Sequence, residues 1–244
     1  MRKIVFLLLT TITLSVSAQK SVLLRHNYTQ GDHYAIKVDT KQDLGPQGSM
    51  TMNMTMGMIV EEANNQNIKT ESKVVSISMD MLQGGTTMSY DSNKKEEELD
   101  QMGLMMKSQF DPLMKVVIYT TQDGLGNISE AKVEPAIPGA EQMTNNIKTL
   151  KFPEEKVSVG SSWTSKEETQ GITMNIIYTV RSIANKLVTL DVSGNVTGAG
   201  TGTIKGEAIV DSSNGISKAA NLEVTINTQG ITIVSTTNTT TTKL

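Results

Sequence analysis

The sequence predicts a mainly β protein of the α+β type: a strongly curved antiparallel sheet or half-barrel of roughly ten strands, a usual size for a sheet. One or two helices are expected to pack on its concave face. Apolar and polar residues alternate at period two in many segments, as they do in half-buried strands. Glycine-rich turns such as Gly84-Gly85 and Asp123-Gly124 separate these segments, and the stretch near 94–109 changes to a helical period.

The first 18 residues have the pattern of a secretory signal peptide. Met1-Arg2-Lys3 is basic, residues 4–14 are largely apolar, and Val16-Ser17-Ala18 supplies small residues before a cleavage point after Ala18. The apolar run is shorter than the about 20 residues of a membrane-spanning helix, so no membrane span is expected. We therefore expect an exported, periplasmic or secreted protein. Its signal peptide covers 1–18, and a single β-rich domain over 19–244 divides into weak pseudo-halves at 19–150 and 151–244.

Composition narrows the classes of partner and site. The chain has no cysteine, which excludes disulfides, thiolate metal sites and a lipid anchor on cysteine. Without Arg2 and Lys3, the 22 basic residues fall to 20 against 25 acidic residues, a net charge of −5. This mild negative charge argues against nucleic acid as a partner. Aromatic residues make up 4% of the sequence, so we expect a core built from aliphatic side chains and methionine.

A methionine strand dominates the first half of the domain. It follows an alternating strand near 34–38, and five methionines occupy every second position from residue 50 to residue 58. Since side chains alternate across a strand, the five thioethers share one face and lie roughly 6.5–7 Å apart along it. A second alternating run over 75–81 is expected to place its apolar residues on the same face.

A helix is expected at about 94–109. Asn93 and Glu96 fit an N-cap and a capping box, and Asp111-Pro112 is expected to stop the helix. Its apolar stripe consists of Leu99, Met102, Met106 and Phe110. A weaker helical stripe follows in Met143, Ile147 and Leu150.

The second half is expected to hold another set of alternating strands, between residues 172 and 233. Trp163 precedes them and is interpreted as a packing anchor, because a lone tryptophan is more often structural than functional. The last alternating run begins at Ile231 and continues into a threonine-rich stretch over 236–242. Because threonine favours strands, this stretch is predicted to be an edge strand that frays.

The methionine face allows three interpretations. It is core packed beneath the helix, because methionine fills irregular gaps. Alternatively, it is an adaptable apolar groove for a lipid-like ligand, because flexible thioethers repack around variable partners. In the third interpretation the thioethers bind Cu(I), since soft sulfur selects a soft metal. The residues expected to line the face are Met52, Met54, Met56, Val75, Ile77, Met79, Met102 and Met106.

The sequence holds little that indicates catalysis. His26 and His33 have no metal-ligand spacing and are interpreted as isolated surface residues beside turns. No Gly-x-Ser-x-Gly elbow occurs, so a hydrolase of that type has no support. We therefore expect no enzyme activity, no catalytic residue and no cofactor, and assign no metal ligands.

Several turn and strand markers resemble those of a family of exported proteins of unknown function found mostly in Bacteroidetes-type bacteria. The markers are Ser17-Ala18-Gln19, Gly31-Asp32-His33-Tyr34, Tyr90-Asp91-Ser92, Phe152-Pro153, Val159-Gly160-Ser161-Ser162-Trp163 and the threonine-rich last strand. The resemblance implies an exported location and no known activity. By analogy, it implies a fold similar to that of the lipoprotein carriers LolA and LolB, in which a curved antiparallel sheet wraps an apolar face around helices. The chain departs from those carriers in having few aromatic residues for the sheet.

These observations favour a non-enzymatic periplasmic or secreted protein that binds a lipid-like apolar ligand on a methionine-rich concave face. The alternative is a cell-envelope interaction or structural module that adds its threonine-rich edge strand to a partner protein. Cu(I) binding by the methionines is the third expectation.

Overall fold

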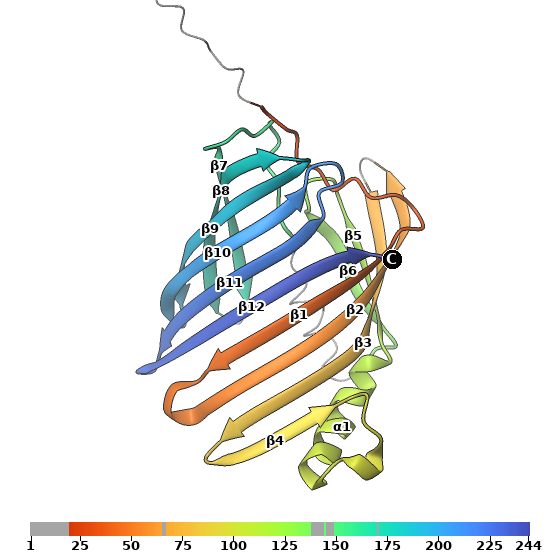
Figure 1. Ribbon diagram of the computed structural model, residues 1–244, viewed down its shortest axis with the longest axis vertical. Coiled ribbons are helices and arrows are strands. Elements are labelled where there is room, and N and C mark those ends of the chain that lie inside the picture. Colours follow the sequence, from red (N-terminus) through yellow and green to blue (C-terminus); the bar gives the residue numbers. More distant parts are fainter. Residues whose placement is uncertain (1–19, 65–66, 138–143, 145–148, 170) are drawn as a thin grey trace, which may run out of the picture.

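A computed structural model describes residues 20–64, 67–137, 144, 149–169 and 171–244. The chain forms a curved, open antiparallel sheet of twelve strands, which confirms the mainly β prediction with two strands more than the rough count. Figure 1 shows the sheet bending around its inner face, with β5 and β6 on one side and β7 and β8 on the other. The expected signal peptide, and Met143 and Ile147 of the second helical stripe, lie outside the described residues.

The strands have the period-two burial that the sequence indicates. The strands of the first half are β1 (His33–Asp43), β2 (Gly48–Asn64), β3 (Asn67–Gln83), β4 (Thr86–Asp91), β5 (Val117–Gln122) and β6 (Ile128–Glu134). The strands of the second half are β7 (Ser162–Thr169), β8 (Ile172–Ala184), β9 (Leu187–Gly198), β10 (Thr201–Asp211), β11 (Ser217–Thr228) and β12 (Ile231–Lys243). A short 3₁₀ turn, η1 (Gly45–Gln47), connects β1 to β2.

The first and last strands meet at the centre of the sheet. The strand order is β6-β5-β3-β2-β1-β12-β11-β10-β9-β8-β7, and β4 pairs with the part of β3 that β5 leaves free. The threonine-rich strand β12 therefore pairs with β1 on one side and β11 on the other. The prediction that it is a fraying edge strand is wrong: the strands at the two ends of the order are β6 and β7.

The helix begins and ends later than predicted. Residues Glu96–Glu98 form a 3₁₀ turn, η2, and α1 covers Gln101–Met114. Its N-cap is Asp100, whose carboxylate accepts a hydrogen bond from the backbone N–H of Gly103 at 2.7 Å. Pro112 lies within the last turn and does not stop the helix. A proline there removes one backbone donor but keeps a helical φ, so the helix continues to Met114.

Two unequal apolar regions cover the inner face, which we define as the face that carries Met52, Met54 and Met56. The strands β8 to β10, together with Leu24, Phe152 and Val157, supply a continuous aliphatic core whose buried members are 0–9% exposed. Trp163 packs against this aliphatic core as predicted, stacking on Tyr178 with ring centroids 5.5 Å apart. On the other half of the sheet, the buried residues form two small clusters separated by a cavity.

The chain before β1 forms an N-terminal strap, residues 20–32, across one end of the sheet (Figure 1). Val22 pairs with Val157, the His26 N–H donates to the Gly124 carbonyl at 2.8 Å, and the Asn27 N–H donates to the Asn214 carbonyl at 3.0 Å. The strap therefore ties the β5–β6 turn to the β10–β11 turn and closes this end of the inner face.

Candidate functional site

A cavity of about 640 Å³ lies on the inner face of β12, β1, β2, β3 and β5. Its volume falls in the usual range for small-molecule sites. The strap closes one end of it, and α1 covers apolar residues toward the other. The lining residues are His26, Tyr28, Ile36, Val38, Met52, Met54, Met56, Met58, Thr70, Ser72, Val74, Ile118, Thr120, Gln122, Thr149, Leu150, Ile216, Ser217, Thr239 and Thr241.

Four methionines form the floor of the cavity. Met52, Met54, Met56 and Met58 all lie on the inner face of β2, as the alternation predicts, and we call them the methionine row. All four are half-buried rather than enclosed, although β2 pairs with β1 and β3 along its length. Because a methionine side chain has three rotatable bonds and a polarizable sulfur, such a floor can change shape to fit different apolar occupants.

Val75 is a correction to the predicted site. The register between β2 and β3 shifts at this point, from Thr55 opposite Ser76 to Met56 opposite Val74. The extra residue in β3 reverses the alternation. Odd-numbered residues such as Ile77 face inward on one side of the bulge, and even-numbered residues such as Val74 face inward on the other side. Val74 therefore lines the cavity, and Val75 lies on the outer face, where it is 60% exposed.

The remaining four predicted residues lie at the helix end of the cavity and do not line it. Ile77 and Met79 are 7% and 8% exposed, and Met106 packs from α1 into a helix-end cluster. The members of this helix-end cluster are Val74, Ile77, Tyr90, Met52, Met54, Met56, Met106, Phe110 and Met114. Met102 is half-buried on α1 but lies outside this cluster. The helix thus covers one end of the methionine row through Met106, Phe110 and Met114.

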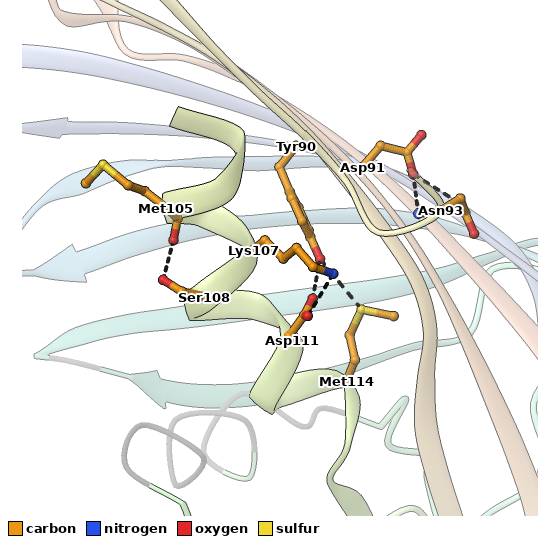
Figure 2. Close-up of polar contacts among 8 residues, drawn as sticks. All are labelled: Tyr90, Asp91, Asn93, Met105, Lys107, Ser108, Asp111 and Met114. Carbon is orange, nitrogen blue, oxygen red and sulfur yellow. Dashed lines mark hydrogen bonds and ion pairs between the residues drawn. The ribbon is translucent and has the colours of Figure 1, made fainter. Parts of the chain in front are cut away.

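Tyr90 fixes α1 against the sheet, as Figure 2 shows. Its hydroxyl donates to Asp111 at 3.1 Å, and the same carboxylate forms an ion pair with Lys107 at 2.8 Å. The Tyr90 ring stacks on Phe110 with centroids 5.4 Å apart. Burial and the hydrogen bond to Asp111 raise the pKa of Tyr90 to about 12, so the phenol stays protonated and keeps its donor.

His26 lies at the opposite, closed end and corrects the prediction of a surface histidine. It is 7% exposed, and its Nε2 donates to the Leu150 carbonyl at 2.8 Å. Because that nitrogen carries the proton, Nδ1 accepts a hydrogen bond from the Tyr28 hydroxyl at 2.9 Å. Burial lowers the pKa of His26 below its ordinary value of 6.5, so the imidazole is neutral near pH 7. His33 is exposed, as predicted.

Gln122 places a buried amide at the same closed end. The residue is 4% exposed and lines the cavity from the end of β5. Burial raises the pKa of the neighbouring Tyr28 phenol, and a side-chain hydrogen bond from Gln122 lowers it in part. Apart from this contact with the phenol, Gln122 Nε2 has no hydrogen-bond partner within the described residues. A buried donor of this kind costs about 1–3 kcal/mol unless a ligand or water accepts from it.

The lining of the cavity is amphipathic, and none of its described residues is an aspartate, glutamate, lysine or arginine. Hydroxyl-bearing residues concentrate toward β5 and β12, and Thr70 bonds to Thr120 at 2.6 Å between the hydroxyl oxygens. No cluster of three or more histidine, cysteine or carboxylate side chains that could hold a metal occurs in the described ranges. No helix among those ranges is long and apolar enough to cross a membrane.

Comparisons with known proteins give a family match and a distant structural match. Residues 138–242 match the model of a family of unknown function, DUF6263. No curated protein matches the chain. Among solved structures, a candidate AttH protein from Nitrosomonas europaea is similar at 8% sequence identity with a TM-score of 0.23. The alignment covers 89% of this chain, which spans about half (52%) of that protein.

Sequence patterns missed most of the polar lining. Ile36 and Val38 could have been assigned from their alternation on β1, since they pair with Met56 and Met54. Ile118, Thr120 and Gln122 also follow period two. Which face of the sheet their side chains lie on, however, depends on where β5 pairs with β3. His26 and Tyr28 belong to the strap, which has no regular period, so only the folded chain brings them to the cavity.

Proposed function

We propose that this is an exported, non-enzymatic binding protein that holds an apolar chain in the cavity above the methionine row. The single observation that carries the proposal is that Met52, Met54, Met56 and Met58 are half-buried around a cavity of about 640 Å³ whose described lining residues carry no charged side chain. The proposed exported location rests on the signal-peptide pattern of residues 1–18.

The physical support is the hydration of the methionine row. Apolar side chains that remain partly open to water gain free energy when another apolar surface covers them, about 25 cal/mol for each Å² removed from water. A row of four thioethers between flanking apolar residues such as Ile36, Val38 and Ile118 offers such a surface. Since the floor can repack, a range of chains rather than one rigid molecule would fit.

The competing proposal is a protein-interaction module that adds its threonine-rich strand to a partner. The position of this strand, β12, does not support that proposal. β12 uses both of its edges within the sheet, pairing with β1 and β11. Strand addition requires an unpaired edge, so this strand cannot accept a partner without first leaving the sheet.

A neutral fluorescent dye, N-phenyl-1-naphthylamine, tests the proposal. We expect its emission to rise on titration with the wild-type protein, because the dye is apolar and carries no charge. Met54→Gln combined with Met56→Gln keeps the side-chain length but makes the floor polar, and should weaken dye binding at least tenfold. Val75→Gln is the matched control, because it adds the same amide on the outer face of the adjacent strand.

Two results would overturn the proposal. One is a wild-type protein that leaves dye emission unchanged. The other is a double variant that binds the dye as tightly as the Val75→Gln control does. Far-ultraviolet circular dichroism and urea unfolding of all three proteins separate loss of the cavity floor from loss of the fold.

A further inference from the structure

We propose that the occupant of the cavity is an uncharged acyl lipid, an ester or amide, whose carbonyl oxygen accepts a hydrogen bond from Gln122 Nε2. Its chain then runs along the methionine row toward α1. This inference rests on the proposed function and specifies the chemistry and direction of the ligand.

The direction follows from the unequal ends of the cavity. At the strap end, His26, Tyr28, Gln122 and Thr149 bring polar atoms to the wall. At the α1 end, Met52 and Met54 meet the apolar side chains of Met106, Phe110 and Met114. An amphipathic molecule lowers its free energy only when its polar group faces the strap and its chain faces the helix.

The need for an acceptor follows from which donors are already used. The His26 Nε2–H is committed to the Leu150 carbonyl, and the Tyr28 hydroxyl is committed to His26 Nδ1. Gln122 Nε2 is buried, lines the cavity and, apart from its contact with the Tyr28 phenol, has no hydrogen-bond partner in the part of the chain that the structure describes. A ligand oxygen beside it would satisfy this donor, and a carbonyl oxygen accepts without needing a further donor of its own.

The absence of charge follows from the lining. Among the described residues that line the cavity, none is a lysine or arginine that could pair with a carboxylate or phosphate. His26, a titratable base in the lining, is held neutral by burial, and the nearby carboxylate of Asp123 adds negative rather than positive charge. Transferring an ionised head group to this end would leave a charge without a counter-ion, which is strongly unfavourable.

Displacement of N-phenyl-1-naphthylamine by two ligands with the same chain tests the inference. Monolauroylglycerol carries a neutral ester and laurate carries a carboxylate. At pH 7.5 we expect monolauroylglycerol to displace the dye from the wild-type protein at a concentration at least tenfold lower than laurate does. Gln122→Met keeps the length of the side chain and removes the donor. It should weaken displacement by monolauroylglycerol about 5–10-fold, the value of one hydrogen bond, relative to the dye affinity measured for the same variant.

The control variant is Gln30→Met, which makes the same replacement at an exposed position of the strap and should leave every affinity unchanged. Dye binding without preference for the ester, or an unchanged ester affinity in Gln122→Met, would overturn the inference while the proposed function stands. Failure of the wild-type protein to bind the dye at all would overturn the proposed function itself.

Discussion

The two halves of the sheet share one architecture but close their inner faces differently. On β9, Val188 and Leu190 are fully buried and belong to a continuous aliphatic core. On β2, every member of the methionine row is half-buried and lines a cavity. Branched side chains have few rotamers and pack densely, whereas methionine is flexible and packs loosely. Strand pairing is alike in the two halves, so the shape of the inner-face side chains decides which half packs without a cavity.

The largest expected difference concerns truncation in the two halves. Leu190→Ala should lower the free energy of unfolding by about 2–5 kcal/mol, because it leaves a cavity in a packed core. Met54→Ala removes a side chain that already borders a cavity, so its cost should be about 1–2 kcal/mol, below the core range. Urea unfolding of both variants measures the difference. Equal costs would contradict the division between a packed half and an open half.

The next effect concerns the closure of the cavity by the strap. Gly126 has φ +88°, and a Cβ there would lie 2.6 Å from the Leu150 carbonyl oxygen and 2.9 Å from His26 Nε2. Gly126→Ala should therefore cost about 2–4 kcal/mol, from backbone strain and displacement of both neighbours. Gly160→Ala is the matched control.

Gly160 has φ +89° and nothing within 4 Å of its would-be Cβ, so its substitution should cost only the backbone strain, about 1–2 kcal/mol. Thermal unfolding of the two variants gives the comparison. If Gly126→Ala and Gly160→Ala are equally stable, the strap does not press on the β5–β6 turn.

A pH-dependent effect should come from His26. Burial lowers the pKa of His26 in the folded protein. As the pH falls below about 6.5, the unfolded chain therefore binds a proton at this histidine while the folded protein does not. The stabilisation is fully present above this pH and is lost progressively as the pH falls below it. Urea midpoints between pH 7.5 and 5.5 should therefore fall less in His26→Gln than in the wild type. A His26→Gln slope equal to that of the wild type would refute the assignment.

The smallest expected effect tests the bulge between β2 and β3. Val75→Thr, on the outer face, should change the free energy of unfolding by no more than about 0.5 kcal/mol. Val74→Thr has the same change in atoms but buries a hydroxyl in the cavity wall, and should cost about 1–3 kcal/mol. Chemical denaturation measures both costs. If Val75→Thr cost more than Val74→Thr, the bulge would be contradicted and Val75 would face inward, as uninterrupted alternation predicts.

Period-two alternation was enough to predict the mainly β fold and the facing of Met52, Met54 and Met56, because strand geometry alone fixes both. It failed where pairing with a neighbour decides the outcome. Val75 faces outward because of a bulge that exists only in the β2–β3 pair. The threonine-rich strand lies at the centre of the sheet because β1 pairs with it across nearly the whole sequence, which no local pattern records. The start of α1 at Asp100 was missed because Asn93 presented an equally good capping residue earlier in the chain.

The most direct test of the binding cavity is nuclear magnetic resonance of protein labelled with ¹³C at the methionine methyl groups, titrated with N-phenyl-1-naphthylamine. The aromatic rings of the dye should shift the methyl signals of Met52, Met54, Met56 and Met58. The signals of Met105, which is 54% exposed on α1, and of Met174, which packs against the aliphatic core, should stay in place. Shifts that are absent, or that are largest at Met105 and Met174, would contradict a ligand cavity above the methionine row.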